Sequence, residues 1–496
     1  MTKALQQIDW LAVAAPLTLA VAAVVVLLVD AFAGPPRTYR AALVPSALTV
    51  LAVLGAAVPA LLLVGDPRST FCIERPLEGP APCSFAVDPF TLVVWGIVLF
   101  GTGVVALVAT ASVREGRIPQ GEWHFLLLCS SAGALTLAAS RDLVTLLVAL
   151  EVVSLPAFAL AGLRSGDRRA AEAALKFFLV SVVSTAVTLM GISLLYGATG
   201  AVFLDHLAAA VAAGTGPRQV LVVGALLTVV GLAFKVAAVP FHMWVPDTYT
   251  GAPIAVAAYL SVVSKTAGFA GLVLVLSTGL GGLAEVWTPV LAVMAALTMT
   301  VGNVLALRQQ HAVRLLAWSS VAQAGYVLAP FAAVAADPDA LGATLGYLAV
   351  YAIVNLGAFS VAAVVGTRHP GQNLSDYRGL IREEPGAGWA LAFALLALAG
   401  LPPGIVGLLA KVVVLDAVAG PATWLAVVMA VNVAIGLVYY ALWLRELFRP
   451  ADVAGASTYD VPNGTAAAIG MTFTAGLLFS VFPGWLLDPV LAAVGG

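Results

Sequence analysis

Charge is what this sequence most lacks. Only 10% of its 496 residues are Asp, Glu, Lys or Arg, whereas soluble domains carry about 25%. Cysteine is almost absent as well, with three residues whose spacing fits neither a zinc nor an iron–sulfur motif. The net charge of −2 provides no basic excess of the kind that nucleic-acid-binding domains have. These shortages argue against a soluble protein, an iron–sulfur carrier and a nucleic-acid-binding protein.

Hydrophobic residues dominate instead, at 61% of the chain. A bilayer core about 30 Å thick needs roughly 20 apolar residues per helix, whereas a β-barrel needs shorter segments that alternate in polarity. Fourteen runs of helical length cover Leu11–Phe32, Ala41–Val64, Phe90–Ala111, Trp123–Ala139, Leu143–Gly162, Leu175–Tyr196, Val220–Val239, Ile254–Leu276, Val286–Leu307, Leu315–Ala335, Leu341–Val365, Trp389–Val418, Ala422–Leu444 and Ala466–Leu487. The sequence therefore predicts an all-α polytopic membrane protein with a single transmembrane domain.

Basic residues are distributed unequally between the loops on the two sides of this predicted bundle. Fourteen spans place both termini on one side, and the loops of the opposite side hold fourteen arginines. The loops on the side of the termini hold only Lys3, Arg68, Arg75, Arg141 and Arg218. Because cytoplasmic loops carry the excess of Lys and Arg, both termini are predicted outside the cytoplasm. Cys72 and Cys83 share an outer loop. The sequence leaves open whether they form a disulfide there or remain two free thiols.

Four basic residues remain once the loops are counted, and all four are lysines in spans. They are Lys176, Lys235, Lys265 and Lys411. A lysine at the centre of a membrane helix costs roughly 2.5–3.5 kcal/mol on insertion scales, so several of them require a function. A buried lysine can gain and lose a proton near neutral pH, whereas arginine stays charged. A row of buried lysines therefore indicates proton transfer.

Glu151 is the acidic residue that lies deepest in a span, about eight residues into the fifth, or roughly 12 Å. It is the natural counter-ion for a buried lysine, because the pair lowers the cost of both charges and couples their titrations. The alternative is a static ion pair that only fixes helix packing, but one such pair would not account for the other lysines. Lys176 lies at a span end, one turn from Glu172, where it can extend to the interface instead.

Helix-breaking prolines accompany three of the buried charges. Glu151, Lys235 and Lys411 lie within eight residues of Pro156, Pro240 and Pro403, respectively. Backbone groups freed by a proline are tolerated in a membrane only where protein or water satisfies them. Transporters built from inverted repeats place their binding sites at pairs of such broken helices. The seventh and twelfth spans, five helices apart, are predicted to form such a pair.

Two longer motifs carry a family resemblance. Residues 235–253 read KVAAVPFHMWVPDTYTGAP, which resembles the signature of the antiporter-like membrane subunits of respiratory complex I, and subunit N in particular. Residues 314–326, RLLAWSSVAQAGY, are similar to a second family segment. Lysine at position 411 favours N over the sister subunit M, which usually carries glutamate there. The resemblance implies two inverted five-helix repeats, helices 4–8 (123–276) and 9–13 (286–444), flanked by helices 1–3 (1–111) and helix 14 (466–487).

The resemblance also implies a function. It predicts a membrane-arm subunit that translocates protons across the bacterial cell (inner) membrane, with the antiporter-like subunits M and L and small membrane subunits as partners. FMN, iron–sulfur clusters, NADH and quinone would be bound by other subunits, and no cofactor or metal is expected in this chain. The absence of a G-x-G-x-x-G fingerprint in the sequence agrees with that expectation.

A proton relay follows from this reading. We expect Glu151 to stabilise protonated Lys235, Lys265 to pass the proton across the middle, and Lys411 to exchange it with the second half-channel. His242 is either a relay member or a capping group at the helix break, and both readings remain open.

The tenth span contains a departure from the family pattern. Family members often carry a relay histidine where this chain has Gln323, and glutamine does not titrate near neutral pH. Water held with Ser319 and Ser320 is therefore expected to bridge that position.

Two other functions are compatible with the sequence: a subunit of an Mrp-type cation/proton antiporter, and a purely structural membrane subunit.

Overall fold

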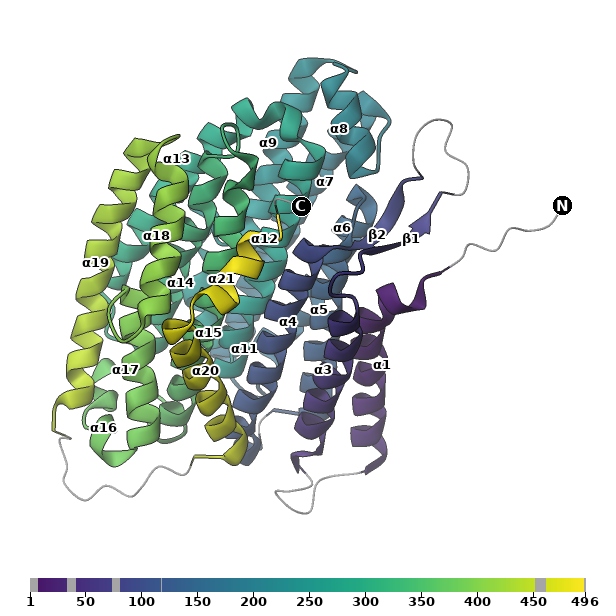
Figure 1. The fold of residues 1–496 in the computed structure, drawn as a ribbon. Helices are drawn as coiled ribbons and strands as arrows, with labels where there is room; N and C mark the ends of the chain where they lie inside the picture. Colours follow the sequence, from purple (N-terminus) through teal and green to yellow (C-terminus); the bar gives the residue numbers. More distant parts are fainter. Residues whose placement is uncertain (1–7, 34–41, 74–80, 117, 451–460, 495–496) are drawn as a thin grey trace.

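The computed structural model describes residues 8–33, 42–73, 81–116, 118–450 and 461–494, and Figure 1 shows a bundle of long helices. The N-terminal part contains α1 (Trp10–Ala33), α3 (Val44–Leu62), β1 (Arg68–Cys72), β2 (Cys83–Val87) and α4 (Pro89–Val108). The middle part contains α5 (Gln120–Ala139), α6 (Leu143–Gly162), α7 (Arg168–Thr199), α8 (Leu204–Ala212), α9 (Arg218–Lys235), α10 (Trp244–Gly251), α11 (Ile254–Tyr259) and α12 (Lys265–Val273). The C-terminal part contains α13 (Ala284–Ala306), α14 (Ala312–Leu328), α15 (Leu341–Arg368), α16 (Leu380–Glu383), α17 (Pro385–Ala399), α18 (Ile405–Ala419), α19 (Thr423–Phe448), α20 (Asn463–Val481) and α21 (Gly484–Leu491).

The predicted helical membrane fold is confirmed. Within the described residues, twelve helical segments are long and apolar enough to cross a membrane. Two further predicted spans correspond to α5 and to the interrupted pair α17–α18. The structure differs in detail, because the sixth span is extended to Arg168–Thr199, whereas the twelfth is interrupted at Gly400 as predicted. The short helix α8 and the β1–β2 hairpin lie outside the predicted spans, and α21 begins within the last predicted span and ends beyond it.

Aspartates fix where three of the helices begin. The side chains of Asp88, Asp142 and Asp167 each accept hydrogen bonds from backbone N–H groups at the starts of α4, α6 and α7. Such caps satisfy donors that have no partner within the helix. The cap at Asp142 sets the start of α6, and that start determines how deep Glu151 lies.

The helices differ sharply in how far the rest of the chain surrounds them. The α11–α12 segment and α14 are each 94% buried over their most apolar window, and α15 is 100% buried. The same measure is 33% for α1, α7 and α19. The centre of the bundle is therefore formed by α11, α12, α14 and α15, and the other helices separate these four from the lipid.

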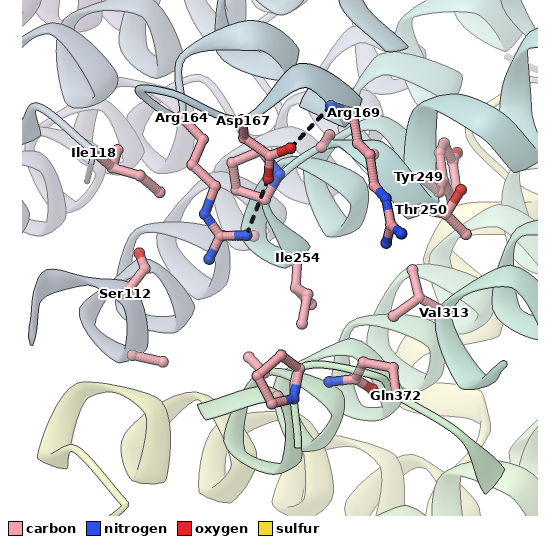
Figure 2. A pocket seen from close by; sticks show the side chains of 18 of the residues that line it. Ser112, Ile118, Arg164, Asp167, Arg169, Tyr249, Thr250, Ile254, Val313 and Gln372 are labelled. Carbon is pink, nitrogen blue, oxygen red and sulfur yellow. Dashed lines mark hydrogen bonds and ion pairs between the residues drawn. The ribbon is translucent and has the colours of Figure 1, made fainter. Parts of the chain in front are cut away.

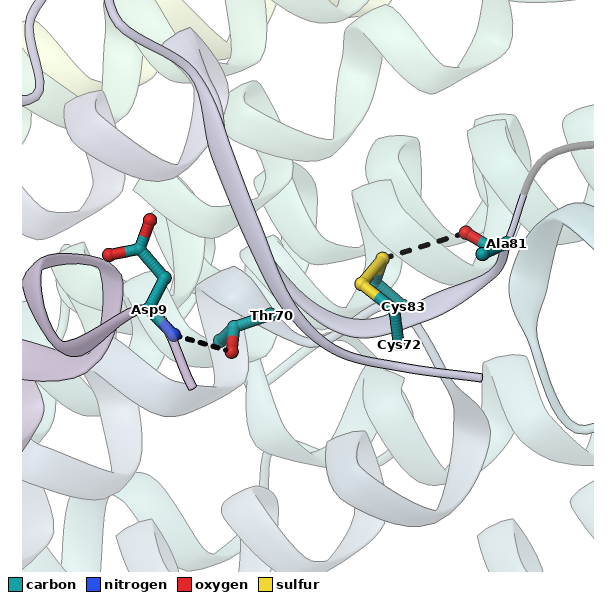
Figure 3. The surroundings of a disulfide bond; sticks show 5 residues. All are labelled: Asp9, Thr70, Cys72, Ala81 and Cys83. Carbon is teal, nitrogen blue, oxygen red and sulfur yellow. Dashed lines mark hydrogen bonds between the residues drawn. A yellow bond between two sulfur atoms is a disulfide. The ribbon is translucent and has the colours of Figure 1, made fainter. Parts of the chain in front are cut away.

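The β1–β2 hairpin lies at one end of the bundle, and α16 lies at the other (Figure 1). The two strands pair antiparallel, and Cys72 and Cys83, which face each other, form a disulfide (Figure 3). The Asp9 N–H donates to Thr70 Oγ1 at 3.1 Å, so the hairpin also holds the start of α1. The structure thus resolves the open question of these two cysteines in favour of the disulfide.

Candidate functional site

Lys235 is the last residue of α9, at the edge of the first helix interruption. Regular helix resumes only at Trp244. Ala237 within the break has a positive φ of 63°, a backbone conformation that residues other than glycine rarely adopt. The N–H of Val239 donates to Thr298 Oγ1 of α13 at 2.9 Å, which ties the irregular segment to a neighbouring helix. The interruption predicted for the seventh span is therefore present, and a lysine lies at its edge.

The Lys235 side chain is 3% exposed and reaches α6. Its Nζ donates to Ser154 Oγ at 2.8 Å, and that hydroxyl donates to the Leu150 carbonyl at 2.6 Å. Glu151 accepts instead from Thr185 Oγ1 at 2.7 Å. Among the described residues no ion pair within 4.0 Å joins Lys235 to Glu151, although the glutamate charge still acts on the lysine electrostatically. The predicted partners thus lie on neighbouring elements but are held by separate hydroxyl groups.

Lys265 lies at the centre of the bundle and is 1% exposed. It begins α12 directly after a π-helical turn, Leu260–Ser264, and such turns recur at functional sites. Its Nζ donates to both the carbonyl oxygen and the hydroxyl of Ser320 on α14, at 2.5 and 2.6 Å. The Tyr351 hydroxyl of α15 donates to the same Ser320 Oγ at 2.9 Å. Lys265 is therefore joined directly to α14 and, through Ser320, to α15, without an acidic partner among the described residues.

Lys411 lies in the second turn of α18, after the second interruption. That interruption begins at Gly400, whose φ of 85° ends α17. The Lys411 Nζ donates to the Leu398 carbonyl at 2.6 Å, in the last turn of α17. Carbonyls in that turn lack helical partners, and the negative end of the helix dipole favours a cation there. The Tyr347 ring centre, 6.0 Å from Nζ, adds a further favourable contact.

Gln323 lies on α14, one turn beyond Ser320, and lines a cavity together with Lys411. Its Nε2 donates to the Tyr440 hydroxyl at 3.1 Å, and its Oε1 accepts from the Tyr347 hydroxyl. The hydroxyl oxygens of Tyr440 and Ser319 are 2.5 Å apart. The tyrosine hydroxyls thus form a polar link that our sequence analysis missed.

A small cavity lies beside this link. It is lined by Gln323, Tyr347, Tyr351 and Lys411, among others, and has about 10 Å³ of room for the centre of a water molecule. That is close to the minimum for one water. The cavity therefore has room for about one water molecule beside Gln323.

Lys176 and His242 lie apart from these contacts. Lys176 is 47% exposed and forms ion pairs with Glu172 of the same helix at 2.8 Å and with Asp247 of α10 at 2.9 Å. The structure thus favours an interfacial role for this lysine. The His242 ring packs near Trp318, with 5.5 Å between ring centres, and its Nδ1 has no hydrogen-bond partner among the described residues. It contacts none of the buried lysines through a hydrogen bond.

Two larger cavities open at opposite ends of the α11–α12 segment. One, of about 570 Å³, is lined by Arg164, Arg169 and Ile254 among others (Figure 2). The other, of about 640 Å³, includes Asp88 and Ser277 in its lining. Lys265 lies between them, about 16 Å along the helix from Ile254 and about 18 Å from Ser277 at 1.5 Å per residue. A single helical segment therefore runs from one cavity past a buried lysine to the other.

Together these features define a polytopic membrane protein with buried lysines at two broken helices, the architecture of an antiporter-like transporter. Residues 140–436 match the family described as "NADH:quinone oxidoreductase/Mrp antiporter, TM". NADH-quinone oxidoreductase subunit N 2 of Streptomyces griseus is 52% identical over 96% of this chain and 92% of its own length. Subunit N of Salinispora tropica is 44% identical over 87% of this chain and 84% of its own length.

Solved structures agree with these sequence relatives. A chain of respiratory complex I from Thermus thermophilus, 30% identical, superposes with a TM-score of 0.75 over 97% of this chain and all of its own length. A chain of the Mrp complex from a Dietzia species superposes with a TM-score of 0.83 over 98% of this chain and 97% of its own, at 22% identity, and so shares the fold. The chain belongs to the antiporter-like membrane subunit family, and within it to NADH-quinone oxidoreductase subunit N.

Proposed function

We propose that this chain carries protons across the membrane as subunit N of an NADH:quinone oxidoreductase, by way of Glu151, Lys235, Lys265 and Lys411. The observation that carries the proposal is the row of three buried lysines, two of them at helix interruptions and the third between two cavities. A merely structural role would require one ion pair, whereas these lysines are held by hydroxyl and carbonyl oxygens. Such neutral acceptors allow a lysine to lose its proton without leaving a charged partner behind.

The roles of the residues follow from their contacts. Lys235 takes or gives a proton at Ser154, under the influence of the Glu151 charge. Lys265 lies between the two cavities and transfers the proton to the polar groups around Ser320. The Tyr347–Gln323–Tyr440 link and one water then connect it to Lys411. Because glutamine is neutral, the proton passes beside Gln323 through water rather than onto it.

The setting of the subunit is part of the same proposal. The redox chemistry, with its flavin, iron–sulfur clusters and quinone, takes place in other subunits, and subunits M and L lie beside this one in the membrane arm. The two repeats comprise residues 123–276 and 286–444. Both termini lie on the non-cytoplasmic side of the bacterial cell membrane, which the Cys72–Cys83 disulfide supports, because such bonds persist in oxidising compartments.

The test uses the assembled complex in inside-out membrane vesicles, with NADH oxidation and proton uptake measured in parallel. Lys235→Ala is expected to lower the protons moved per NADH, and Lys235→Arg is expected to do the same, because arginine keeps the charge but does not titrate. Lys176→Ala is the matched control, since that lysine is exposed and paired with carboxylates. Normal pumping by assembled Lys235→Arg complex would show that the charge is only structural.

A further inference from the structure

Three arginines surround one buried glutamate at the end of the bundle that holds α16 (Figure 1). Glu446, in the last turn of α19, has a side chain that is 10% exposed. Its Oε2 accepts from Arg378 Nε at 2.9 Å, and its Oε1 accepts from Arg445 Nη2 at 3.2 Å and from Arg449 Nη1 at 2.9 Å. These three arginines and Glu446 form an arginine cluster with an excess of two positive charges.

The two arginines of α19 are held by the glutamate but remain accessible. The Arg445 side chain is 56% exposed and the Arg449 side chain 45% exposed, although each contacts Glu446. A guanidinium has five N–H donors, so a hydrogen bond to one carboxylate oxygen leaves most of them available. Planar guanidinium groups bind phosphate oxygens in pairs, and groups that are already fixed in place lose less freedom on binding. The arginine cluster is therefore a preformed site for an anion of the phosphate class.

Two other acidic side chains at this end of the bundle have partners of their own. Asp376 accepts from the Asn373 N–H at 2.7 Å, and Glu383 lies 3.6 Å from Arg368. They therefore leave the excess charge of the arginine cluster in place.

An exposed apolar face of α19 leads to the two arginines. Val431, Val438 and Leu442 are exposed side chains of this helix. Steps of three, four or seven residues place them on one face of the helix, and Arg445 and Arg449 continue that face to its end. One face of α19 thus consists of hydrocarbon followed by fixed positive charge.

Aromatic side chains mark the depth of the arginine cluster in the membrane. Trp389 of α17 and Phe448 of α19 are exposed, and their rings lie edge to face with 5.9 Å between centres. Trp424, near the opposite end of α19, is exposed as well, about 36 Å from Phe448 at 1.5 Å per residue. Tryptophan is enriched at both interfaces of a bilayer, whose hydrocarbon core is about 30 Å thick. The arginines next to Phe448 therefore lie at the level of the lipid headgroups.

We propose that the arginine cluster binds the phosphate group of an anionic phospholipid, whose acyl chains lie along the exposed face of α19. A phospholipid carries a negative headgroup and hydrocarbon in the same order as this face, and basic residues beside a membrane helix attract anionic lipids. Free phosphate would match the charge but not the aliphatic face. The site goes beyond the proposed function, because it includes no residue of the proton relay.

A photo-crosslinking residue identifies what covers this face in the assembled complex. Leu442 is replaced by p-benzoylphenylalanine, and the complex is reconstituted in vesicles of equal parts phosphatidylglycerol and phosphatidylcholine with the same acyl chains. After irradiation, mass spectrometry of the α19 peptide identifies the attached molecule. We expect phosphatidylglycerol adducts to exceed phosphatidylcholine adducts at least about fivefold, because nearby basic residues strengthen the binding of anionic lipid. Equal amounts of the two lipids, or attachment to a peptide of another subunit, would overturn the proposal.

Val304 of α13 is the matched control position for the crosslinker. It is exposed, and one exposed arginine, Arg308, lies a turn further on, just after the end of α13. The crosslinker at Val304 should give nearly equal amounts of the two lipids, because a single arginine carries less charge than the arginine cluster. A preference at Val304 as large as that at Leu442 would mean that the whole surface attracts anionic lipid, and the specific site would be disproved.

Substitution of the arginines tests the headgroup site itself. With the crosslinker at Leu442, Arg445→Gln/Arg449→Gln should bring the ratio of the two lipids to about one, because glutamine can donate hydrogen bonds but carries no charge. Arg449→Gln alone leaves two arginines on Glu446 and should lower the ratio part of the way. The single variant keeps the test decisive if the double variant does not assemble. A ratio that the substitutions leave unchanged would overturn the role of the arginines.

A comparison of salts separates a bound lipid from free phosphate. Sodium phosphate and sodium chloride are compared at equal ionic strength, so that both screen charges equally. A lipid that is also held by its acyl chains should give the same ratio in both salts. If phosphate abolishes the preference and chloride does not, the arginine cluster binds the free anion, and the assignment to a lipid is wrong.

Discussion

The two broken helices hold their lysines in different ways. Lys235 precedes its interruption, donates to a side-chain hydroxyl, and lies near a carboxylate. Lys411 follows its interruption and donates to a backbone carbonyl, with an aromatic ring nearby. The first lysine therefore depends on groups that single substitutions can remove, whereas the second depends on the position of a helix end. The comparison shows that one buried charge is controlled by side chains and the other by backbone geometry.

The largest effect is expected from Gly407→Ala, which acts on the backbone-held lysine. A Cβ at Gly407 would lie 1.9 Å from the Ala397 carbonyl oxygen, so α18 would have to move away from the end of α17. Overpacking of this kind costs about 1–3 kcal/mol, or more. We expect little assembled complex and almost no pumping, measured by native gel and proton uptake. Gly420→Ala, where a Cβ has open space, is the control, and equal behaviour of the two variants would contradict the backbone account.

Glu151→Gln comes next and tests the side-chain-held lysine. Glutamine keeps an oxygen that can accept from Thr185 but removes the charge that acts on Lys235. We expect pumping to fall roughly tenfold, which corresponds to about 1.4 kcal/mol on the barrier. Glu285→Gln removes an exposed carboxylate in the first turn of α13 and should pump normally. If the Glu151→Gln complex pumps at the control rate, the charge of Glu151 does not control Lys235.

Ser154→Ala should have a smaller effect than the loss of the charge. It deletes the acceptor of the Lys235 hydrogen bond, but a water molecule can partly replace the hydroxyl. A net loss of about 1 kcal/mol predicts roughly fivefold slower pumping. Leu398→Met is the corresponding change at the second lysine, because it keeps the carbonyl that Lys411 uses. If Leu398→Met slows proton uptake more than Ser154→Ala does, Lys411 depends on a side chain as much as Lys235 does, and the comparison fails.

Gly268→Ala should have the smallest effect. A Cβ there would lie 2.9 Å from Lys235 Cγ and 3.0 Å from Val236 Cγ1, which are side-chain atoms, whereas the Cβ at Gly407 would meet a backbone carbonyl oxygen. The Lys235 stem can shift, so we expect at most about a twofold change, or about 0.4 kcal/mol. The informative measurement is the ratio of this effect to that of Gly407→Ala. A ratio near one would mean that Lys235 is held as rigidly as Lys411.

The helices and the buried lysines could be predicted from the sequence because both depend on residue type alone. Apolar runs of about 20 residues define membrane helices, and a lysine within such a run is visible as a single letter. The prolines near Lys235 and Lys411 likewise indicated the interruptions. The missing titratable group at position 323 could also be predicted, because the sequence has the amide Gln323 where a histidine was expected.

The contacts of these residues could not be predicted in the same way. Tyr347, Tyr351 and Tyr440 count as apolar residues within their spans, so their hydroxyl link was missed. The spacing of Tyr347 and Tyr351 by four residues, which places them on one face of a helix, was the available signal. No sequence pattern marks the Leu398 carbonyl as an acceptor, because a backbone carbonyl becomes free only where the helix is interrupted. The sequence suggested a direct pair of Glu151 with Lys235, but Ser154, one turn further along α6, is the group that reaches the lysine.

The burial of α14 has a consequence for how the protein is made. Of the twelve candidate membrane helices it is the least apolar, and it is 94% buried by the rest of the chain. When α14 leaves the ribosome, α15 and α19, which later surround its polar face, have not yet been synthesised. The Ser319–Tyr440 and Ser320–Tyr351 contacts can form only afterwards. We therefore expect α14 to enter the bilayer stably only together with its later neighbours, so that biogenesis of the second repeat is a collective step.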